Sequence, residues 1–248
     1  VLTGRRAFRR MPPARLDVSE YGDDEPGPGG LAPGAFGSAR AAVLEGWRFD
    51  RAAYGVTLAA YQAADPAHWL ALETAARALA DGGFPGGQGL ARDRTGVIIG
   101  NTLTGEVSRA AALRTRWPYV RRVLRAALAA GAVSPDRHAE VIEHAAAGFL
   151  APFPEIGDDT LAGSLPGAIA DRICGHFGFR GGGHAVDAAH SSSLLAIAAA
   201  CSALASGDLD AAIAGGVDIS LDPFELAGLA GTGVLATGEM RVFDARPT

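Results

Sequence analysis

The sequence predicts an α/β fold built around a parallel β-sheet. A strand-like segment at Ala185–Ala189, a helix-like segment at Ser191–Ser206 and a second strand-like segment at Asp210–Ile219 follow one another directly. Strand, helix and strand in this order form a βαβ unit, because two parallel strands need a crossover between them. A further apolar run, Thr95–Gly100, is short and bounded by glycine, as a buried strand is.

The spacing of apolar residues predicts a helix at Pro66–Ala80. Asp65 is a suitable N-cap, and Gly82-Gly83 follows the last turn. Within this segment the apolar residues recur at helical spacing: Trp69, Leu72, Ala76 and Leu79.

Residues 107–163 are interpreted as a helical insertion or lid. One helix is predicted at Arg109–Ala130, with an interruption near Pro118, and another at Pro135–Leu150. Both surround a stripe of alanine and leucine with charged residues. A third helix is predicted at Leu165–Phe177.

The two ends differ in character from the middle. Residues 1–40 form a loop-rich lead-in, and Gly22–Gly37 is its richest part in glycine and proline. A strand is predicted at Met240–Phe243, close to the C-terminal residue. Because the chain starts in mid-pattern at Val1, we expect it to be a piece of a longer domain.

Composition excludes several classes of protein. The 248 residues are 48% hydrophobic and 20% charged, which is typical of a globular protein, and the net charge of −5 argues against general affinity for nucleic acid. No uninterrupted apolar run has the ~18 residues that span a bilayer, so no membrane association is expected. Two cysteines cannot form a disulfide framework, which favours a cytoplasmic location.

The segment Val186-Asp-Ala-Ala-His-Ser-Ser-Ser-Leu-Leu-Ala196 carries the strongest functional signal. A strand ends there, residue 190 lies at the bend, and a serine-rich turn starts a helix. Unpaired backbone N–H groups and the macrodipole at a helix N-terminus favour negative charge. An activated thiolate or a bound oxyanion needs such surroundings, so His190 and its neighbours Ala189 and Ser191 are the candidate site.

This segment resembles the nucleophile elbow of β-ketoacyl synthases, which usually reads Asp-Thr-Ala-Cys-Ser-Ser-Ser. Other segments fit the same family: Thr95-Gly-Val-Ile-Ile-Gly-Asn-Thr102, Ala200-Cys-Ser-Ala-Leu-Ala-Ser-Gly-Asp208, Ala214-Gly-Gly-Val-Asp218 and Arg241-Val-Phe-Asp244. Some segments also resemble the iterative enediyne-type polyketide synthases: Ala42-Val-Leu-Glu-Gly-Trp47, Asn101-Thr-Leu-Thr-Gly-Glu106 and Arg116-Trp-Pro-Tyr-Val-Arg-Arg122.

The resemblance implies a thiolase-like fold, layered α/β/α/β/α when complete, of which residues 1–248 are the N-terminal part of one domain. It implies a condensing enzyme of polyketide biosynthesis that acts on acyl and malonyl groups carried by an acyl carrier protein. It also implies a homodimer whose elbow strands, here Gly183–Ala189, pair across the two-fold axis. No metal, nucleotide or flavin cofactor is implied, and the family's two active-site histidines are expected after Thr248.

His190 departs from the family pattern, because the resemblance places a nucleophilic cysteine there. An acyl-imidazole is more labile to water than a thioester, and imidazole is bulkier than a thiol. Three explanations stay open. The chain has lost condensing activity, like chain-length-factor or decarboxylating partner subunits; or it is a variant of a parent with cysteine; or His190 itself works as nucleophile or base.

The remaining candidate residues are given structural interpretations. Ser191, Ser192 and Ser193 are expected to cap the helix and to form hydrogen bonds to its first turn, since no Gly-x-Ser-x-Gly elbow surrounds them. Cys174 and Cys201 are predicted to be small core residues. The other histidines are expected to be structural or solvated: His68, His138, His144, His176 and His184. A cluster of arginines is a solvated face or a docking surface for an acidic carrier protein: Arg109, Arg114, Arg116, Arg121, Arg122 and Arg125.

Overall fold

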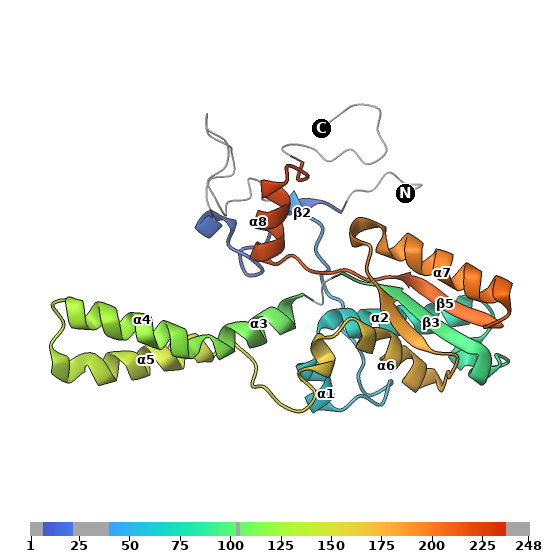
Figure 1. Cartoon of the computed structure of the whole chain (residues 1–248), viewed down its shortest axis with the longest axis horizontal. Helices are drawn as coiled ribbons and strands as arrows, with labels where there is room; N and C mark the ends of the chain where they lie inside the picture. The colour runs from blue at the N-terminus through green and yellow to red at the C-terminus, as the bar shows by residue number, and fades with distance from the viewer. Residues whose placement is uncertain (1–6, 22–39, 103–104, 237–248) are drawn as a thin grey trace. The chain divides into compact units, whose positions relative to one another are not determined.

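The computed structural model describes residues 7–21, 40–102 and 105–236 (Figure 1). The predicted strand at Met240–Phe243 and the whole of Gly22–Gly37 lie outside these ranges. The chain divides into two compact units, residues 1–48 with 221–248 and residues 49–220. The second unit contains the predicted parallel sheet.

The sheet of the second unit has three strands in the order β4-β3-β5. They are β3 (Thr95–Gly100), β4 (Gly183–Val186) and β5 (Ala211–Gly216). Both pairings are parallel, with Gly100 beside Val186 on one side and beside Gly216 on the other. The C-terminal ends of all three strands therefore meet at one edge of the sheet.

Helices cover both faces of this sheet. On one face lies α7 (Ser192–Ser206), and on the other lie α2 (Pro66–Asp81) and α6 (Gly167–Phe177) (Figure 1). The fully buried strand β3 shows how the layers form. Ile98 packs against Ala196 and Ala200 of α7, whereas Ile99 faces α2. Alternate residues of one strand thus serve opposite helical layers.

The predicted helix after Asp65 is confirmed as α2. The Asp65 carboxylate accepts a hydrogen bond from the backbone N–H of Ala67 at 3.0 Å, and Pro66 occupies the first turn, where its missing N–H costs nothing. The stripe predicted from spacing is largely buried, with Trp69 and Leu72 each only 2% exposed. Ahead of α2 lies the short helix α1 (Leu58–Ala63).

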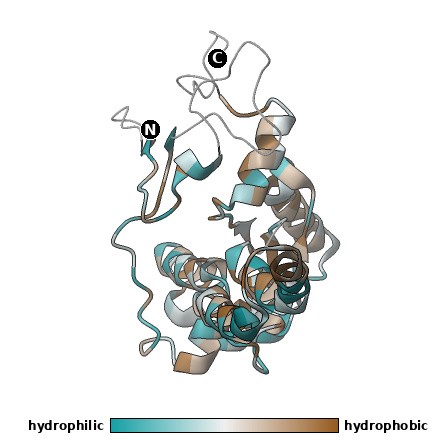
Figure 2. Cartoon of the chain, turned by 90° about the vertical axis from the view of Figure 1, so that its left-hand side faces the viewer, coloured by the Kyte–Doolittle hydropathy of each residue, from teal (hydrophilic) through white to brown (hydrophobic). Residues whose placement is uncertain are grey.

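Residues 106–150 form three helices, α3 (Glu106–Thr115), α4 (Trp117–Ala130) and α5 (His138–Leu150). The predicted break falls at Arg116, and Pro118 lies inside the first turn of α4, where proline is tolerated. The helices α4 and α5 pack as a hairpin in which Trp117 contacts Phe149, with ring centroids 5.6 Å apart. No residue of either helix is buried. Hydrophobic and hydrophilic residues lie side by side on the helices of this view (Figure 2).

The first unit contains a short antiparallel pair, β1 (Arg9–Arg10) with β2 (Arg40–Ala41), and the helix α8 (Pro223–Gly231). The Asp222 side chain caps α8 by accepting from the N–H of Phe224 at 2.8 Å. Single turns of 3-10 helix complete the described chain: η1 (Val18–Tyr21), η2 (Pro85–Gly87), η3 (Arg92–Arg94), η4 (Pro135–Arg137), η5 (Ala162–Ser164) and η6 (Ala189–Ser191).

Candidate functional site

His190 lies in a tight turn between the end of β4 and the start of α7. The strand ends at Val186 rather than at the predicted Ala189, and the helix begins at Ser192, with η6 (Ala189–Ser191) between them. The strand ends at the pair of Val186 with Gly100, the last residue of β3. Three residues later, Ala189 has φ of 48°, in the left-handed region that alanine rarely adopts. The bend therefore holds backbone strain directly before residue 190.

The serines hold the turn and do not cap the helix. Ser191 Oγ donates to the carbonyl of Ala188 at 2.8 Å, and Ser192 Oγ donates to the carbonyl of Ala189 at 2.6 Å. Ser192 Oγ also accepts from the N–H of Ala188 at 2.9 Å. The predicted capping role is wrong for Ser191, the N-cap residue, which makes no side-chain cap bond. The side chain of His190 is exposed beside this network.

Two glycines allow the N-terminus of α7 to lie directly on the sheet. A Cβ on Gly100 would stand 2.5 Å from the carbonyl carbon of Ser192, and one on Gly216 would stand 2.7 Å from the Cβ of Ser193. Any side chain at either position would push the helix away. Glycines at the ends of β3 and β5 thus fix the distance between the sheet and the turn that carries His190.

Thr102 connects the end of β3 to the same turn. Its hydroxyl donates to the Asp187 carboxylate at 3.0 Å, and Asp187 accepts the N–H of Ala189 at 3.0 Å. The sequence interpretation missed Thr102 as part of the site. Its position just after a buried strand was the available signal, because parallel strands end at one edge.

The two cysteines differ from each other. Cys174 is buried on α6, as predicted, and burial raises the pKa of its thiol. The prediction of a core position for Cys201 is wrong, because α7 buries only one face, through Ala196 and Ala200, and Cys201 lies on the exposed side. Neither thiol lies in the turn at His190.

The remaining histidines do not join His190. His68 is fully buried on α2, whereas His176, on α6, is exposed and stacks edge-on against Phe177 at 4.7 Å. His138 contacts the Val133 carbonyl at 3.0 Å. Within residues 7–21, 40–102 and 105–236, no group of His, Cys, Asp or Glu could hold a metal ion.

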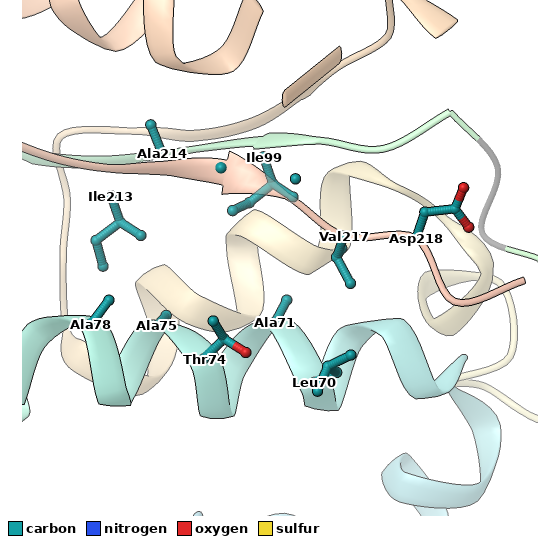
Figure 3. Close-up of a pocket in the computed structure, with 12 residues that line it drawn as sticks. Leu70, Ala71, Thr74, Ala75, Ala78, Ile99, Ile213, Ala214, Val217 and Asp218 are labelled. Atoms are coloured by element: carbon teal, nitrogen blue, oxygen red, sulfur yellow. The ribbon is translucent and has the colours of Figure 1, made fainter. Parts of the chain in front are cut away.

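A pocket of about 230 Å³ lies between α2 and the sheet (Figure 3). Ala71, Ala75 and Ala78 of α2 line one side, and Ile99 and Ile213 line the other. The two isoleucines belong to the sheet and point toward α2, on the opposite side of the sheet from α7. The pocket therefore belongs to the packing of α2 and not to the turn at His190.

The expectation that no segment is long and apolar enough to span a bilayer is wrong for the segment that contains α7. The segment Ala189–Ser206 is one helix of the described chain that is long and apolar enough to cross a membrane, with mean hydropathy 1.3 over 18 residues and 17% of it buried. Its buried residues are Ser192, Ala196 and Ala200, and the two alanines pack against Ile98 of β3. A helix that packs on a sheet in an α/β layer passes the same test, so this segment is weak evidence for a membrane span.

The layered fold and the strand–turn–helix site define a thiolase-like ketosynthase architecture. Residues 1–247 match the family model of the β-ketoacyl synthase N-terminal domain, so the chain belongs to this family. The oxazolomycin ketosynthase domain from Streptomyces albus is similar in structure, with a TM-score of 0.65 and 26% identity over 95% of this chain. The module 6 ketosynthase of the Bacillus subtilis bacillaene synthase gives a TM-score of 0.62 at 20% identity over 95% of this chain.

The similar curated proteins are polyketide synthases. The chain is 30% identical over 244 residues to a phenolphthiocerol/phthiocerol polyketide synthase of Mycobacterium tuberculosis and 32% identical over 246 residues to a mycocerosic acid synthase-like polyketide synthase of Mycolicibacterium smegmatis. Each match covers 98% of this chain but only 11% and 10% of those proteins. The two ketosynthase structures are likewise longer, with 34% and 31% of their chains covered.

Proposed function

We propose that residues 1–248 are the part of a polyketide-synthase ketosynthase that carries the nucleophile elbow, and that the chain is impaired in condensation because His190 replaces the nucleophilic cysteine. The substrates are acyl and malonyl groups on an acyl carrier protein. The observation that carries this proposal is the position of His190. It is exposed, directly after the left-handed Ala189 and two residues before the start of α7.

A cysteine at this position would attack the acyl thioester of the carrier, form an enzyme thioester and release the carrier thiol. Loss of CO₂ from a malonyl thioester would give a carbanion whose attack on the enzyme thioester forms the new C–C bond and frees the cysteine. The start of α7 stabilises a thiolate there. An imidazole at residue 190 gives an acyl-imidazole that water cleaves quickly, so the acyl group is lost before condensation.

A second candidate is a partner subunit without condensing activity, of the chain-length-factor or decarboxylating kind. The absence of the nucleophile at residue 190 favours this candidate, whereas the otherwise intact elbow, with Asp187 and the three serines, favours the enzyme. The two candidates differ in the space around residue 190. An impaired enzyme keeps room for an acyl chain there, and a partner subunit does not need it.

We also propose the partners and setting that the resemblance implied. The edge of β4 opposite β3 is unpaired in the described sheet, which supports a homodimer joined through Gly183–Val186. The likeness to the iterative enediyne-type synthases rests on the resemblance alone. Two free cysteines support a cytoplasmic location.

Intact mass spectrometry tests the proposed impairment directly. The longest soluble form of the protein that contains residues 1–248 is incubated with an acyl thioester of a carrier protein and quenched at short and long times. We expect no durable acyl adduct at residue 190. A stable adduct that peptide mapping places on His190 would show a working histidine nucleophile and contradict the proposal.

A further inference from the structure

The hydroxyl of Thr102 contacts the elbow at three points. Thr102 Oγ1 donates to Asp187 Oδ1 at 3.0 Å, and it lies 3.4 Å from the carbonyl oxygen of Ala189 and 3.3 Å from Ser192 Oγ. Ser192 already gives its proton to the Ala189 carbonyl. The single proton of Thr102 therefore goes to the carboxylate, which is the stronger acceptor and lies closer.

These contacts surround the strained residue of the turn. Ala189 holds φ of 48° because both of its backbone polar groups are bound, the N–H by Asp187 at 3.0 Å and the carbonyl by Ser192 at 2.6 Å. A non-glycine residue in this region costs roughly 1–3 kcal/mol, so it persists only where its surroundings impose it. Thr102 orients the Asp187 carboxylate, the group that fixes one side of Ala189.

Thr102 reaches the turn from a different strand. Gly100 pairs with Val186 in the parallel register, which brings residue 102 beside residue 187, although they are far apart in sequence. The sheet therefore links the end of β3 to the turn through one hydroxyl. Loss of this hydroxyl would leave Asp187 free to turn toward water and would release the N–H of Ala189.

We propose that Thr102 is a positioning residue of the elbow: through Asp187 it holds Ala189 in the left-handed conformation and so sets the direction in which the side chain of residue 190 leaves the turn. This inference rests on the proposed function only in one respect: residue 190 is chosen as the position whose reactivity is measured. A purely structural hydroxyl would add stability to the loop without any effect on the reactivity of residue 190.

The test uses a thiol at position 190. In a His190→Cys background, the rate of alkylation by iodoacetamide is measured against pH for Thr102, Thr102→Val and Thr102→Ser. Peptide mass spectrometry separates the introduced thiol from Cys201, whose exposed thiol on α7 serves as the internal reference. The readout does not require acyl transfer, so failure of this inference and failure of the proposed function are distinguishable.

We expect Thr102→Val to shift the pH–rate profile of the introduced thiol to higher pH and to slow its alkylation at neutral pH about tenfold, the order expected for loss of one charge-assisted hydrogen bond. Thr102→Ser, which keeps the hydroxyl, should stay within about twofold of the Thr102 protein, and Cys201 should react equally in all three. If Thr102→Val does not fold, Thr102→Ala carries the same prediction. A folded variant without the hydroxyl but with an unchanged profile, or a Thr102→Ser protein as slow as Thr102→Val, overturns the proposal.

Discussion

The carboxylate of Asp65 accepts a hydrogen bond from the backbone N–H of Glu106 at 3.0 Å, although the two residues stand at the starts of different helices. One oxygen of Asp65 caps α2 through Ala67, and the other binds Glu106 and Val107 at the start of α3. Asp65 is only 3% exposed. One buried side chain thus accepts hydrogen bonds from the first turns of two helices.

Replacement of Asp65 by alanine should destabilise the protein strongly. The change removes one N-cap and leaves the N–H groups of the second helix without their acceptor, which together cost roughly 2–4 kcal/mol. Asp65→Asn keeps one acceptor oxygen and should cost about half as much. Urea denaturation followed by circular dichroism measures both. A loss below about 1 kcal/mol for Asp65→Ala would show that the second helix does not depend on this carboxylate.

Gly100→Ala should displace α7 from the sheet. The new Cβ would meet the backbone of Ser192 and Ser193, which cannot move aside as a flexible side chain would, so we expect a loss of about 3 kcal/mol. Gly215→Ala is the matched control, because nothing lies within 4 Å of its Cβ position, and it should change stability by less than about 0.5 kcal/mol. Equal stability of the two variants would contradict the close approach.

Stability should fall in mild acid because of His68. Burial lowers the pKa of its imidazole from 6.5 to about 4, and the nearby Arg172 guanidinium contributes to the lowering. Both ring nitrogens are buried and have no hydrogen-bond partner among the residues that the structure describes. Between the two pKa values the unfolded chain binds a proton that the folded chain does not, so stability is full above pH 6.5 and falls as the pH approaches 4.

The size of this effect follows from the shift. The lowering of the His68 pKa corresponds to about 3 kcal/mol in the free energy of unfolding, which is lost progressively as the pH falls from 6.5 to 4. His68→Leu should flatten the pH dependence of the free energy of unfolding between pH 6.5 and 4. Denaturation midpoints measured at half-unit steps check this. An unchanged slope in the His68→Leu protein would mean that other groups cause the acid sensitivity.

The arginines of α4 should contribute to carrier-protein binding. Arg121, Arg122 and Arg125 are exposed and form no ion pair within the described residues, and α4 contains no acidic residue. Charge reversal of all three to glutamate should weaken binding of an acidic carrier protein at least about tenfold at low salt, and added salt should shrink the difference. Isothermal titration calorimetry in two salt concentrations measures both effects.

The control for that experiment reverses three exposed arginines elsewhere, Arg77, Arg137 and Arg180. It changes the net charge by the same amount. An equal loss of affinity in both triple variants would show that the net charge of the protein, and not the position of the arginines on α4, causes the loss. An unchanged affinity in the α4 variant would show that these arginines do not bind the carrier protein and are only exposed to solvent.

The turn at His190 could be predicted from sequence because its signal is local. A strand, a bend and a serine-rich helix start follow one another between Val186 and Ser193, and each has its own residue pattern. The residue at which the strand ends could not be predicted, since it depends on where the paired strand β3 ends, and the left-handed Ala189 could not be predicted either. Nothing in the residue type alanine indicates that conformation.

Two features depended on tertiary structure. Thr102 joins the site only through the pairing of Gly100 with Val186, a long-range register that the pattern of one strand does not specify. The prediction that Cys201 lies in the core was wrong because α7 is apolar nearly all around, from Leu194 to Leu204. The spacing of its apolar residues therefore does not show which face of the helix is buried. Packing on the sheet selects Ala196 and Ala200.

The central claim is that His190, and not the second departure from the usual family wording (Ala188 in place of threonine), separates this elbow from a working nucleophile site. The most direct test is His190→Cys in the longest soluble form of the protein, incubated with an acyl thioester of a carrier protein and read by intact mass spectrometry and peptide mapping. The helix N-terminus at Ser192 is in place to stabilise the thiolate, and small residues, Ala188 and Ala189, adjoin it. We predict a durable acyl thioester on the new cysteine. A well-folded His190→Cys protein that takes up no acyl group would contradict this account and favour the partner subunit.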